Sequence, residues 1–486
     1  KDNQNNDMKP TSVEIPEWVT ASLYDSNGYI TTPLCVYLTK GTHTISMNSQ
    51  REPMLLHKLV LKNSETVKSY EEVRKQWEAD GAKATTDVNI TIQAENVTKT
   101  SSQMLYPKQD QSSPAVYPAS AKELLNNTIG GESWSDAGQW MEWEFEVPES
   151  GYVNISLFDK QSFMRGIYVS RKITIDGEVP FKEMEDYGFT YDSQWRCDVL
   201  SDADGTPYDF YLEKGTHTLR MEVVLGDFSE VISSVQDCVS QLNAIYRKVI
   251  HITGVSPDTY RDYQIEASLP GLSAEMTAVR DQLDQAILDL RAASGRTSDK
   301  ETVLITMRDQ LDYLIADEER FVKVVSTYKQ NVRACGTWIT QVIRQPLQID
   351  RIQVYSPGKT NKIEHNSFWD KLVYEIRRLF YSFIIDYNSL GATDSEESDA
   401  TTITLWVGTG RDQANVIRSL IDESFTSVYG INVNVQLVDM NTLLRAELAG
   451  EGPDVAIQVA NTNGIAGAVL NTGNDTPVNY GLRNAV

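Results

Sequence analysis

One stretch of the chain occurs twice, and this repeat limits the architecture more than any other feature. The segment from Tyr37 to Met47 recurs from Tyr211 to Met221, with eight of eleven positions identical. Each copy places Lys-Gly between two short strand-like runs, which is typical of a β-hairpin. Two hairpins this similar, 174 positions apart, indicate two copies of one folding module.

A second pair of similar segments locates an insertion in the later copy. Arg51-Glu52-Pro53 resembles Arg344-Gln345-Pro346, and each triplet precedes an apolar run, but these segments are 293 positions apart. The additional 119 positions place an insertion at about 227–341. Apolar residues there recur every three or four positions, as on the buried face of a helix: Ile232, Val235, Val239, Leu242, Ile245 and Val249. We therefore predict an antiparallel helical bundle inserted into the second module.

The rest of the second module has the period of β-strands. Met141, Trp143 and Phe145 alternate with glutamates, and a Pro-Glu-Ser-Gly turn joins this strand to the next. Many short strands between turns favour a jelly-roll-like β-sandwich. We assign residues 87–226 and 342–358 to this module, residues 1–64 to the C-terminal part of the first, and residues 65–86 to a helical linker.

Two further segments follow the second module. Residues 359–400 contain an amphipathic helix from Phe368 to Ile385 and an acidic linker. We expect the helix to dock on a neighbouring domain rather than on a membrane surface, because it carries few basic residues. Residues 401–486 alternate strand and helix, which predicts the first part of a parallel α/β lobe with ligands at the carboxyl ends of its strands.

Composition excludes several function classes. The 486 residues carry a formal charge of −24, so the chain is a poor partner for nucleic acid or an anionic membrane. Four cysteines without CxxC spacing indicate neither a zinc site nor a redox motif. Cys238 and Cys335 could pair, but two buried thiols are the favoured interpretation. His43 and His217 occupy equivalent repeat positions, so we interpret them as structural.

A glycine-rich turn supplies the candidate binding residues. Gly408, Thr409, Gly410, Arg411 and Asp412 follow the strand Ile403–Val407 and open a helix, where a ligand could approach backbone N–H groups. The third glycine of a dinucleotide fingerprint and the Gly-Lys-Ser/Thr of a phosphate loop are missing. We predict a cleft-lining turn with no cofactor, no metal site and no catalytic residues.

Aromatic residues of the second module could stack on sugars. We expect Trp143 to be buried, because it is in phase with core positions, and packing is the favoured interpretation for the others as well. The set comprises Tyr117, Trp134, Trp140, Trp143, Tyr187, Tyr191 and Trp195.

The last segment resembles a known family. Ile403–Asp412, Gly430–Val435 and Thr442–Val455 look like the opening of a family 1 extracellular solute-binding protein, and Pro477–Arg483 is similar to a later stretch of it. Upstream, the Lys-Gly-Thr-His turns and Gly138–Trp143 are similar to large Gram-positive members that carry sandwich modules, a helical insertion and a linker helix.

This resemblance implies a function. It implies a cell-surface, lipid-anchored protein that captures an oligosaccharide or similar solute between two α/β lobes for an ABC permease, and it implies no enzymatic activity. Fewer than ninety residues follow Thr401, so we expect a fragment of such a domain. Gly408–Asp412 and Asn461 are the positions that the resemblance places in the cleft.

Two alternatives stay open at this point. The sandwich modules could be carbohydrate-binding accessories of a secreted glycoside hydrolase, or the chain could be a purely structural surface protein. A catalytic barrel in the continuing reading frame would favour the hydrolase. Failure of residues 87–358 to bind any glycan would favour the structural protein.

Overall fold

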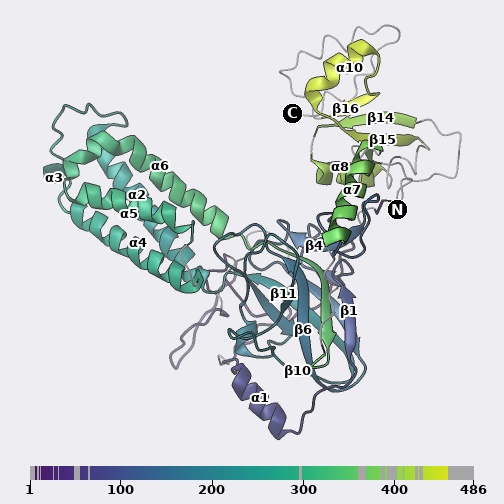
Figure 1. Ribbon diagram of the computed structural model, residues 1–486. Coiled ribbons are helices and arrows are strands. Elements are labelled where there is room, and N and C mark those ends of the chain that lie inside the picture. The colour runs from purple at the N-terminus through teal and green to yellow at the C-terminus, as the bar shows by residue number, and fades with distance from the viewer. Residues whose placement is uncertain are drawn as a thin grey trace. The chain divides into compact units, whose positions relative to one another are not determined.

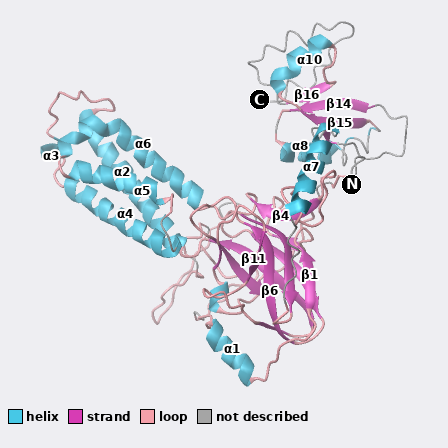
Figure 2. Ribbon diagram, in the orientation of Figure 1, coloured by secondary structure: helices cyan, strands magenta, loops and turns pink. Residues whose placement is uncertain are grey.

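The chain forms two compact units, which are described separately. The computed structural model describes residues 6–7, 10, 12–25, 27–30, 32–48, 55–63, 66–294, 298–359, 368–384, 389–390, 402–408, 410–421, 425, 429 and 431–457 (Figures 1 and 2). Unit 1 comprises Lys1–Thr11, Pro107–Asn127 and Glu364–Val486, and unit 2 comprises Ser12–Tyr106 and Thr128–Ile363.

The described part of unit 2 contains two antiparallel sheets that contribute to one buried core. The first sheet contains β1 (Asn89–Gln93), β4 (Asn126–Gly131), β6 (Gly151–Lys160), β9 (Arg196–Val199), β10 (Phe210–Leu212) and β12 (Leu347–Tyr355). Its strands pair in the order β10–β6–β12–β4, with β1 beside β12 and β9 beside β6. The central strands β6 and β12 pair with each other, although β6 precedes the helical insertion in the sequence and β12 follows it. After the insertion, the chain therefore returns to the same sheet.

The second sheet shows the alternation that the sequence predicts. It contains β2 (Lys99–Thr100), β5 (Trp140–Val147), β7 (Val169–Ile175), β8 (Tyr187–Phe189) and β11 (Gly215–Val224), in the order β2–β5–β11–β7–β8. In β5, Met141, Trp143 and Phe145 are buried, while Glu144 and Glu146 are exposed. Glu142 departs from the pattern: it is buried because its carboxylate accepts two hydrogen bonds from Arg220, at 2.9 and 2.7 Å.

Helices occupy the predicted insertion. The long helices are α2 (Phe228–Thr253), α4 (Leu272–Ser294), α5 (Glu301–Ile315) and α6 (Phe321–Val342), with the short helices α3 (Ile265–Ser268) and η2 (Glu318–Arg320) between them. Each long helix buries an apolar stripe, and α2 buries Ile232, Val235 and Leu242. Stripes of this kind pack against one another in an antiparallel bundle.

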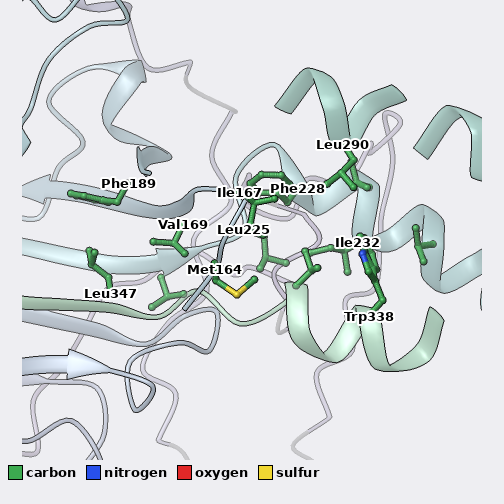
Figure 3. Packing of buried hydrophobic residues seen from close by; sticks show 14 of the residues in the cluster. Met164, Ile167, Val169, Phe189, Leu225, Phe228, Ile232, Leu290, Trp338 and Leu347 are labelled. Atoms are coloured by element: carbon green, nitrogen blue, oxygen red, sulfur yellow. The ribbon is translucent and has the colours of Figure 1, made fainter. Parts of the chain in front are cut away.

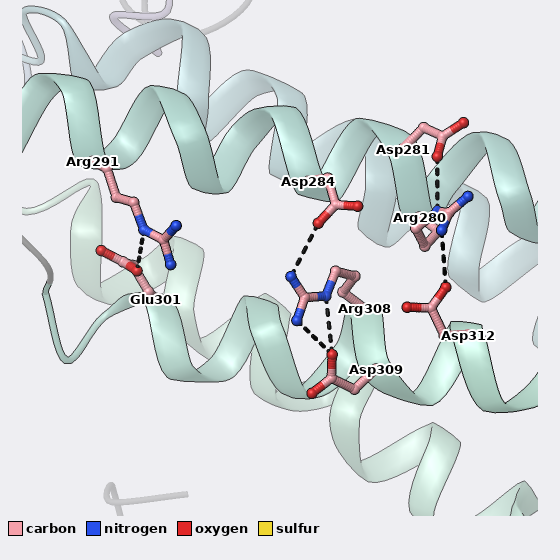
Figure 4. A network of polar contacts seen from close by, with 8 residues as sticks. All are labelled: Arg280, Asp281, Asp284, Arg291, Glu301, Arg308, Asp309 and Asp312. Carbon is pink, nitrogen blue, oxygen red and sulfur yellow. Dashed lines mark hydrogen bonds and ion pairs between the residues drawn. The ribbon is translucent and has the colours of Figure 1, made fainter.

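Ion pairs join α4 and α5 on their polar sides (Figure 4). Arg308 reaches Asp284 at 3.2 Å and Asp309 at 2.6 Å, while Arg280 reaches Asp312 at 3.0 Å. These side chains are partly exposed, so each pair contributes no more than about 1 kcal/mol. Burial of the apolar stripes therefore stabilises the bundle far more than its surface charges do.

The core continues from the sheets into the bundle without interruption (Figure 3). Met164, Leu225, Phe228 and Trp338 belong to the same buried cluster as the strand residues. The ring of Phe228, in the first turn of α2, lies 4.7 Å from that of Tyr168 next to β7. A shared apolar core makes the two sheets and the bundle a single packed structure rather than two domains on a linker.

A buried arginine reinforces this junction. The guanidinium of Arg171 on β7 donates to the carbonyl oxygens of Trp134 at 3.1 Å and Gln345 at 2.7 Å, and it lies 4.0 Å from the Trp134 ring. Gln345 follows α6 and in turn accepts from the Ser170 N–H at 3.0 Å. Burial lowers the pKa of Arg171, although a guanidinium remains charged in proteins.

The first repeat copy keeps the local turns of the second but forms no strand among its described residues, 12–48 and 55–63 apart from Ser26 and Thr31. Nε2 of His43 lies 2.7 Å from the Thr39 carbonyl oxygen, and Nε2 of His217 lies 2.7 Å from that of Glu213. Gly28 and Gly205 share a left-handed φ, 75° and 82°. These matches support a repeat at the level of the turns.

We expected a β-hairpin at Tyr37–Met47, but the described residues of the first copy form no paired strands. In the second copy, β9, β10 and β12 pair with β6, and β11 pairs with β5 and β7. The repeated segment contains no counterpart of the central strands β5, β6 and β7. An isolated hairpin is at best marginally stable, and Tyr37 is accordingly 92% exposed. Assignment of residues 1–64 to a first module stays a prediction.

Within the predicted linker 65–86, helix α1 (Tyr70–Ala79) is shorter than the range assigned to it and packs on the first sheet. Ser69 and Glu72 form a capping box, in which the Ser69 N–H donates to the Glu72 carboxylate at 3.0 Å. Arg74 lies 3.9 Å from the centre of the Tyr152 ring on β6. A short 3-10 turn, η1 (Lys182–Met184), precedes β8.

Unit 1 contains the amphipathic helix α7 and a small sheet with helices. Its elements are β3 (Lys108–Gln109), α7 (Phe368–Ile384), β13 (Ser389–Leu390), β14 (Thr402–Val407), α8 (Arg411–Leu420), β15 (Asn432–Leu437), η4 (Met440–Thr442), α10 (Leu443–Ala449) and β16 (Val455–Ile457). None of the helices within the described ranges combines the length and apolarity needed to cross a bilayer.

Candidate functional site

The parallel sheet of unit 1 has a strand order of the kind that offers a candidate ligand site. Strands β15 and β16 pair in parallel with opposite edges of β14, and β13 adds an antiparallel edge strand to β15. The chain therefore leaves β14 toward one side to form β15 and returns across it to form β16. In such sheets, ligands bind at the carboxyl end of the strand where the direction of winding reverses. That strand is β14.

Two helices cover opposite faces of this sheet. Ala414 of α8 packs with Leu405, Val407, Val433 and Val435 on one face. Leu443 of α10 packs with Trp406 and Met440 on the other. Because neighbouring side chains of β14 point to opposite faces, both clusters come from one continuous apolar strand.

The predicted glycine turn lies at the reversal point. Gly408 directly follows β14, and Gly410 is the N-cap of α8 with φ −63° and ψ 160°. Arg411 and Asp412 form the start of α8, and their side chains lie outside the description. Thr409 and Asn461 also lie outside the described residues, so the structure brings together only part of the predicted set.

The buried side chain of Met440 lies against the glycine turn, a contact that the sequence analysis did not predict. A Cβ added to Gly408 would lie 2.6 Å from the Met440 Cγ, so the glycine lets the β14 turn and the β15 turn approach closely. The neighbouring Asp439 caps η4 by accepting from the Asn441 N–H at 3.0 Å. The available signal was that Asp439 and Met440 follow shortly after the parallel strand β15. Residues that follow neighbouring parallel strands share one edge of the sheet.

Substitution of Gly408 by alanine is expected to destabilise the lobe, whereas substitution of Gly410 is not. The new methyl at position 408 must displace Met440, and such overpacking costs about 1–3 kcal/mol. A Cβ at position 410 meets no atom within 4 Å among the residues described. Urea denaturation would measure the stability of both variants, and equal stabilities would contradict the close approach.

Most of the aromatic residues of the second module contribute to packing. Trp134 and Trp143 are fully buried, and the Trp143 ring N–H donates to the Ala94 carbonyl at 2.9 Å. Trp140 lies beneath the Arg220 guanidinium at 3.9 Å. Trp195 stacks on Phe158 with ring centres 5.6 Å apart. The packing interpretation is confirmed for Trp143 and Trp134, while Tyr117 is 59% exposed.

The structure also shows the surroundings of His217 and of the two cysteines Cys238 and Cys335. His217 lies between the Glu213 carbonyl and the Asp176 carboxylate, 2.6 Å from the latter, and so secures the β10–β11 turn. Cys238 and Cys335 are free and buried, which confirms the favoured interpretation. Burial raises the pKa of each thiol to about 12, which disfavours the reactive thiolate. The part of the chain that is described holds no group of three or more potential metal ligands.

A buried carboxyl group in the sandwich has no hydrogen-bond partner in the described structure. Both oxygens of Asp159, at the end of β6, are buried without one. Burial first, and then Asp198, raise its pKa well above the usual value, while Arg196 opposes the shift and Asp192 adds to it. A raised pKa means that the folded state retains the proton over a pH range in which the unfolded chain releases it.

This arrangement predicts that Asp159→Asn stabilises the protein at neutral pH but not at acidic pH. As the pH rises above about 4, the unfolded chain loses the Asp159 proton first, so the wild type loses stability that the asparagine variant keeps. Thermal melts at pH 4 and pH 7 would measure the difference, with exposed Asp136→Asn as the control. A variant that melts lower at pH 7 would mean that the charged carboxylate stabilises the fold through Arg196.

Comparisons with solved structures give partial likenesses. A family 35 carbohydrate binding module from Clostridium thermocellum is 14% identical with a TM-score of 0.21, over 28% of this chain and 87% of that one. A Paenibacillus sp. cycloisomaltooligosaccharide glucanotransferase, complexed with cycloisomaltoheptaose, is 17% identical with a TM-score of 0.21, over 33% of this chain. This chain spans 21% of that enzyme, and at such scores neither likeness carries an argument.

The sequence comparison is more informative for the bundle. No curated protein matches the chain. Residues 230–331, which begin in α2 and end in α6, match the family model described as the 4-helix bundle domain of bacterial solute-binding proteins. The helical insertion is therefore similar to the bundle domain of bacterial solute-binding proteins.

Proposed function

We propose that the protein is the extracellular solute-binding component of an ABC importer and captures an oligosaccharide for delivery to a membrane permease. The observation that carries the proposal is the reversal of winding at β14, with Gly408 and Gly410 at its carboxyl end. The match of the bundle to solute-binding proteins supports it. In this proposal, the solute lies between this lobe and a second one, and the protein is lipid-anchored at the cell surface.

The α8 N-terminus supplies the polar contacts in this proposal. The first N–H groups of a helix lack intrahelical partners and point toward a ligand at its end. Gly410 has no side-chain cap, so it leaves these N–H groups available to sugar hydroxyl oxygens. The strand that precedes this turn is anchored on both faces of the sheet by the buried side chains of Trp406 and Val407.

Ligand-induced thermal shifts of the complete natural protein against a panel of oligosaccharides would test the function. A saccharide at a hundredfold excess over its Kd stabilises the domain that binds it by about 2.7 kcal/mol. Shifts with peptides or other solutes but with no sugar would contradict the oligosaccharide assignment. Cleavage of the saccharide during the assay would favour the hydrolase alternative.

Gly410→Asp separates binding from folding at this site. The backbone at position 410 is extended, and the added side chain has open space, so an aspartate there can cap α8. Its carboxylate would occupy the N–H groups that the proposal assigns to the ligand. We expect the variant to melt no lower than the wild type and to lose the thermal shift with sugar. An unchanged shift would move the ligand site away from α8.

A further inference from the structure

Helix α7 carries a continuous apolar face that the described residues leave exposed. The exposed residues recur every three or four positions and include Ile376 at 57% and Phe383 at 82%. With 3.6 residues per turn, they occupy a band about 120° wide along the helix. The band comprises Leu372, Val373, Ile376, Leu379, Phe380 and Phe383.

The opposite side of α7 is held in place. The Tyr374 hydroxyl donates to the Ser120 carbonyl at 3.2 Å, and the Arg378 guanidinium donates to the Gln111 carbonyl at 3.1 Å. The Gln111 side chain cross-links this loop through the carbonyls of Ser120, at 3.2 Å, and Glu123, at 2.9 Å. Tyr374 and Arg378 lie two positions from Ile376 in either direction, about 160° around the helix. The apolar band therefore faces away from the loop that holds α7.

We propose that this band is the interface for a second copy of the chain, with the two α7 helices packed in parallel about a two-fold axis. Charge supports this occupant. Arg377 borders one edge of the band and Glu375 the other, each about 100° from Ile376. A parallel pair places Arg377 of each helix beside Glu375 of the other. An antiparallel pair would bring Arg377 toward Arg377 and Glu375 toward Glu375.

The same charges disfavour a membrane as the occupant. An interfacial helix normally borders its apolar face with several lysines and arginines, whereas this band has one residue of each sign at its centre. The chain also carries a net charge of −24, which opposes approach to anionic lipid. A helix of 17 residues is about 25 Å long, so the interface is small and the dimer dissociates on dilution.

Sedimentation velocity of the full chain over a range of concentrations tests the proposal. We expect reversible dimerisation, which Ile376→Glu abolishes. Arg377→Glu turns two attractive contacts into repulsive ones and weakens the dimer about tenfold. The double variant Glu375→Arg with Arg377→Glu restores it, and the exposed Arg333→Glu on α6 leaves it unchanged. Thermal melts verify folding, because Glu375 also contacts Arg378 at 3.3 Å.

Three results would overturn the proposal. An Arg377→Glu variant that associates as tightly as the wild type would mean that the helices are antiparallel, because the substitution would then only replace Arg–Arg repulsion with Glu–Glu repulsion. A monomer at every concentration, with the α7 amides protected from hydrogen exchange, would mean that the band is covered by its own chain. Flotation of the wild type, but not of Ile376→Glu, with phosphatidylcholine vesicles would make the band a membrane contact.

Discussion

Replacement of Phe228 by alanine is expected to destabilise the sandwich and the bundle together, by about 3–5 kcal/mol. Phe228 is fully buried where the two parts meet, and its ring contacts that of Tyr168. The substitution removes apolar contacts and leaves a cavity in a core that both parts share. Differential scanning calorimetry should show that unit 2 melts in one transition, which shifts down on the order of 10 °C.

The shape of that transition distinguishes a shared core from two separate ones. If the bundle were an independent domain, the variant would split the thermogram, with one peak moved and the other unchanged. Leu288→Ala on α4 is the matched control, because this leucine is 54% exposed and its truncation should shift the transition little.

Replacement of Arg171 by alanine is the second large effect, with an expected loss of about 3 kcal/mol or more. The substitution leaves the buried carbonyls of Trp134 and Gln345 without these donors and removes the guanidinium from the Trp134 ring. Gln345 lies where the chain returns from α6 to β12, and Trp134 lies beside it in the loop between β4 and β5. Chemical denaturation followed by tryptophan fluorescence measures the loss, since Trp134 reports on this environment.

Two further variants identify the cause of that loss. Arg171→Met restores apolar volume without donors, and Arg171→Lys restores a charge without the planar set of donors that reaches two carbonyls at once. If hydrogen bonding dominates, both variants stay close to alanine in stability. Recovery with methionine alone would show that the position requires volume rather than donors.

Repeats and periodicity predicted where the strands of the second module give way to helices. The 119-position difference between the two offsets placed the insertion at 227–341, and the helices lie between Phe228 and Val342. This worked because a helical stripe and a strand alternation differ in period, and the period is visible in a single sequence. The turn at His43 was also predictable from His217, because a turn depends on a few neighbouring residues.

Pairing between strands could not be predicted in the same way. The first repeat copy has the apolar alternation of strands, yet its described residues remain without sheet partners, because the strands equivalent to β5, β6 and β7 are not part of the repeat. The alternation of a strand shows which face is apolar but does not identify the strand that lies beside it.

Some features of the candidate site could likewise be predicted from the sequence, and others could not. Gly408 and Gly410 were found from the sequence, because a glycine turn between a strand and a helix is a local signal. Met440 was not found, because its approach to Gly408 depends on β15 lying next to β14. The buried carboxyl of Asp159 likewise gave no signal, since a single aspartate at a strand end is ordinary in sequence.

By itself the sequence determined the repeat, the inserted helices, the strand–helix rhythm of the last segment and the glycine turn, all of which depend on residues close together in the chain. Only the tertiary structure decided that β14 lies between β15 and β16, that one core joins sandwich and bundle, and that α7 faces outward. These features depend on contacts between distant segments, whose formation is governed by the packing of whole faces rather than by any local pattern.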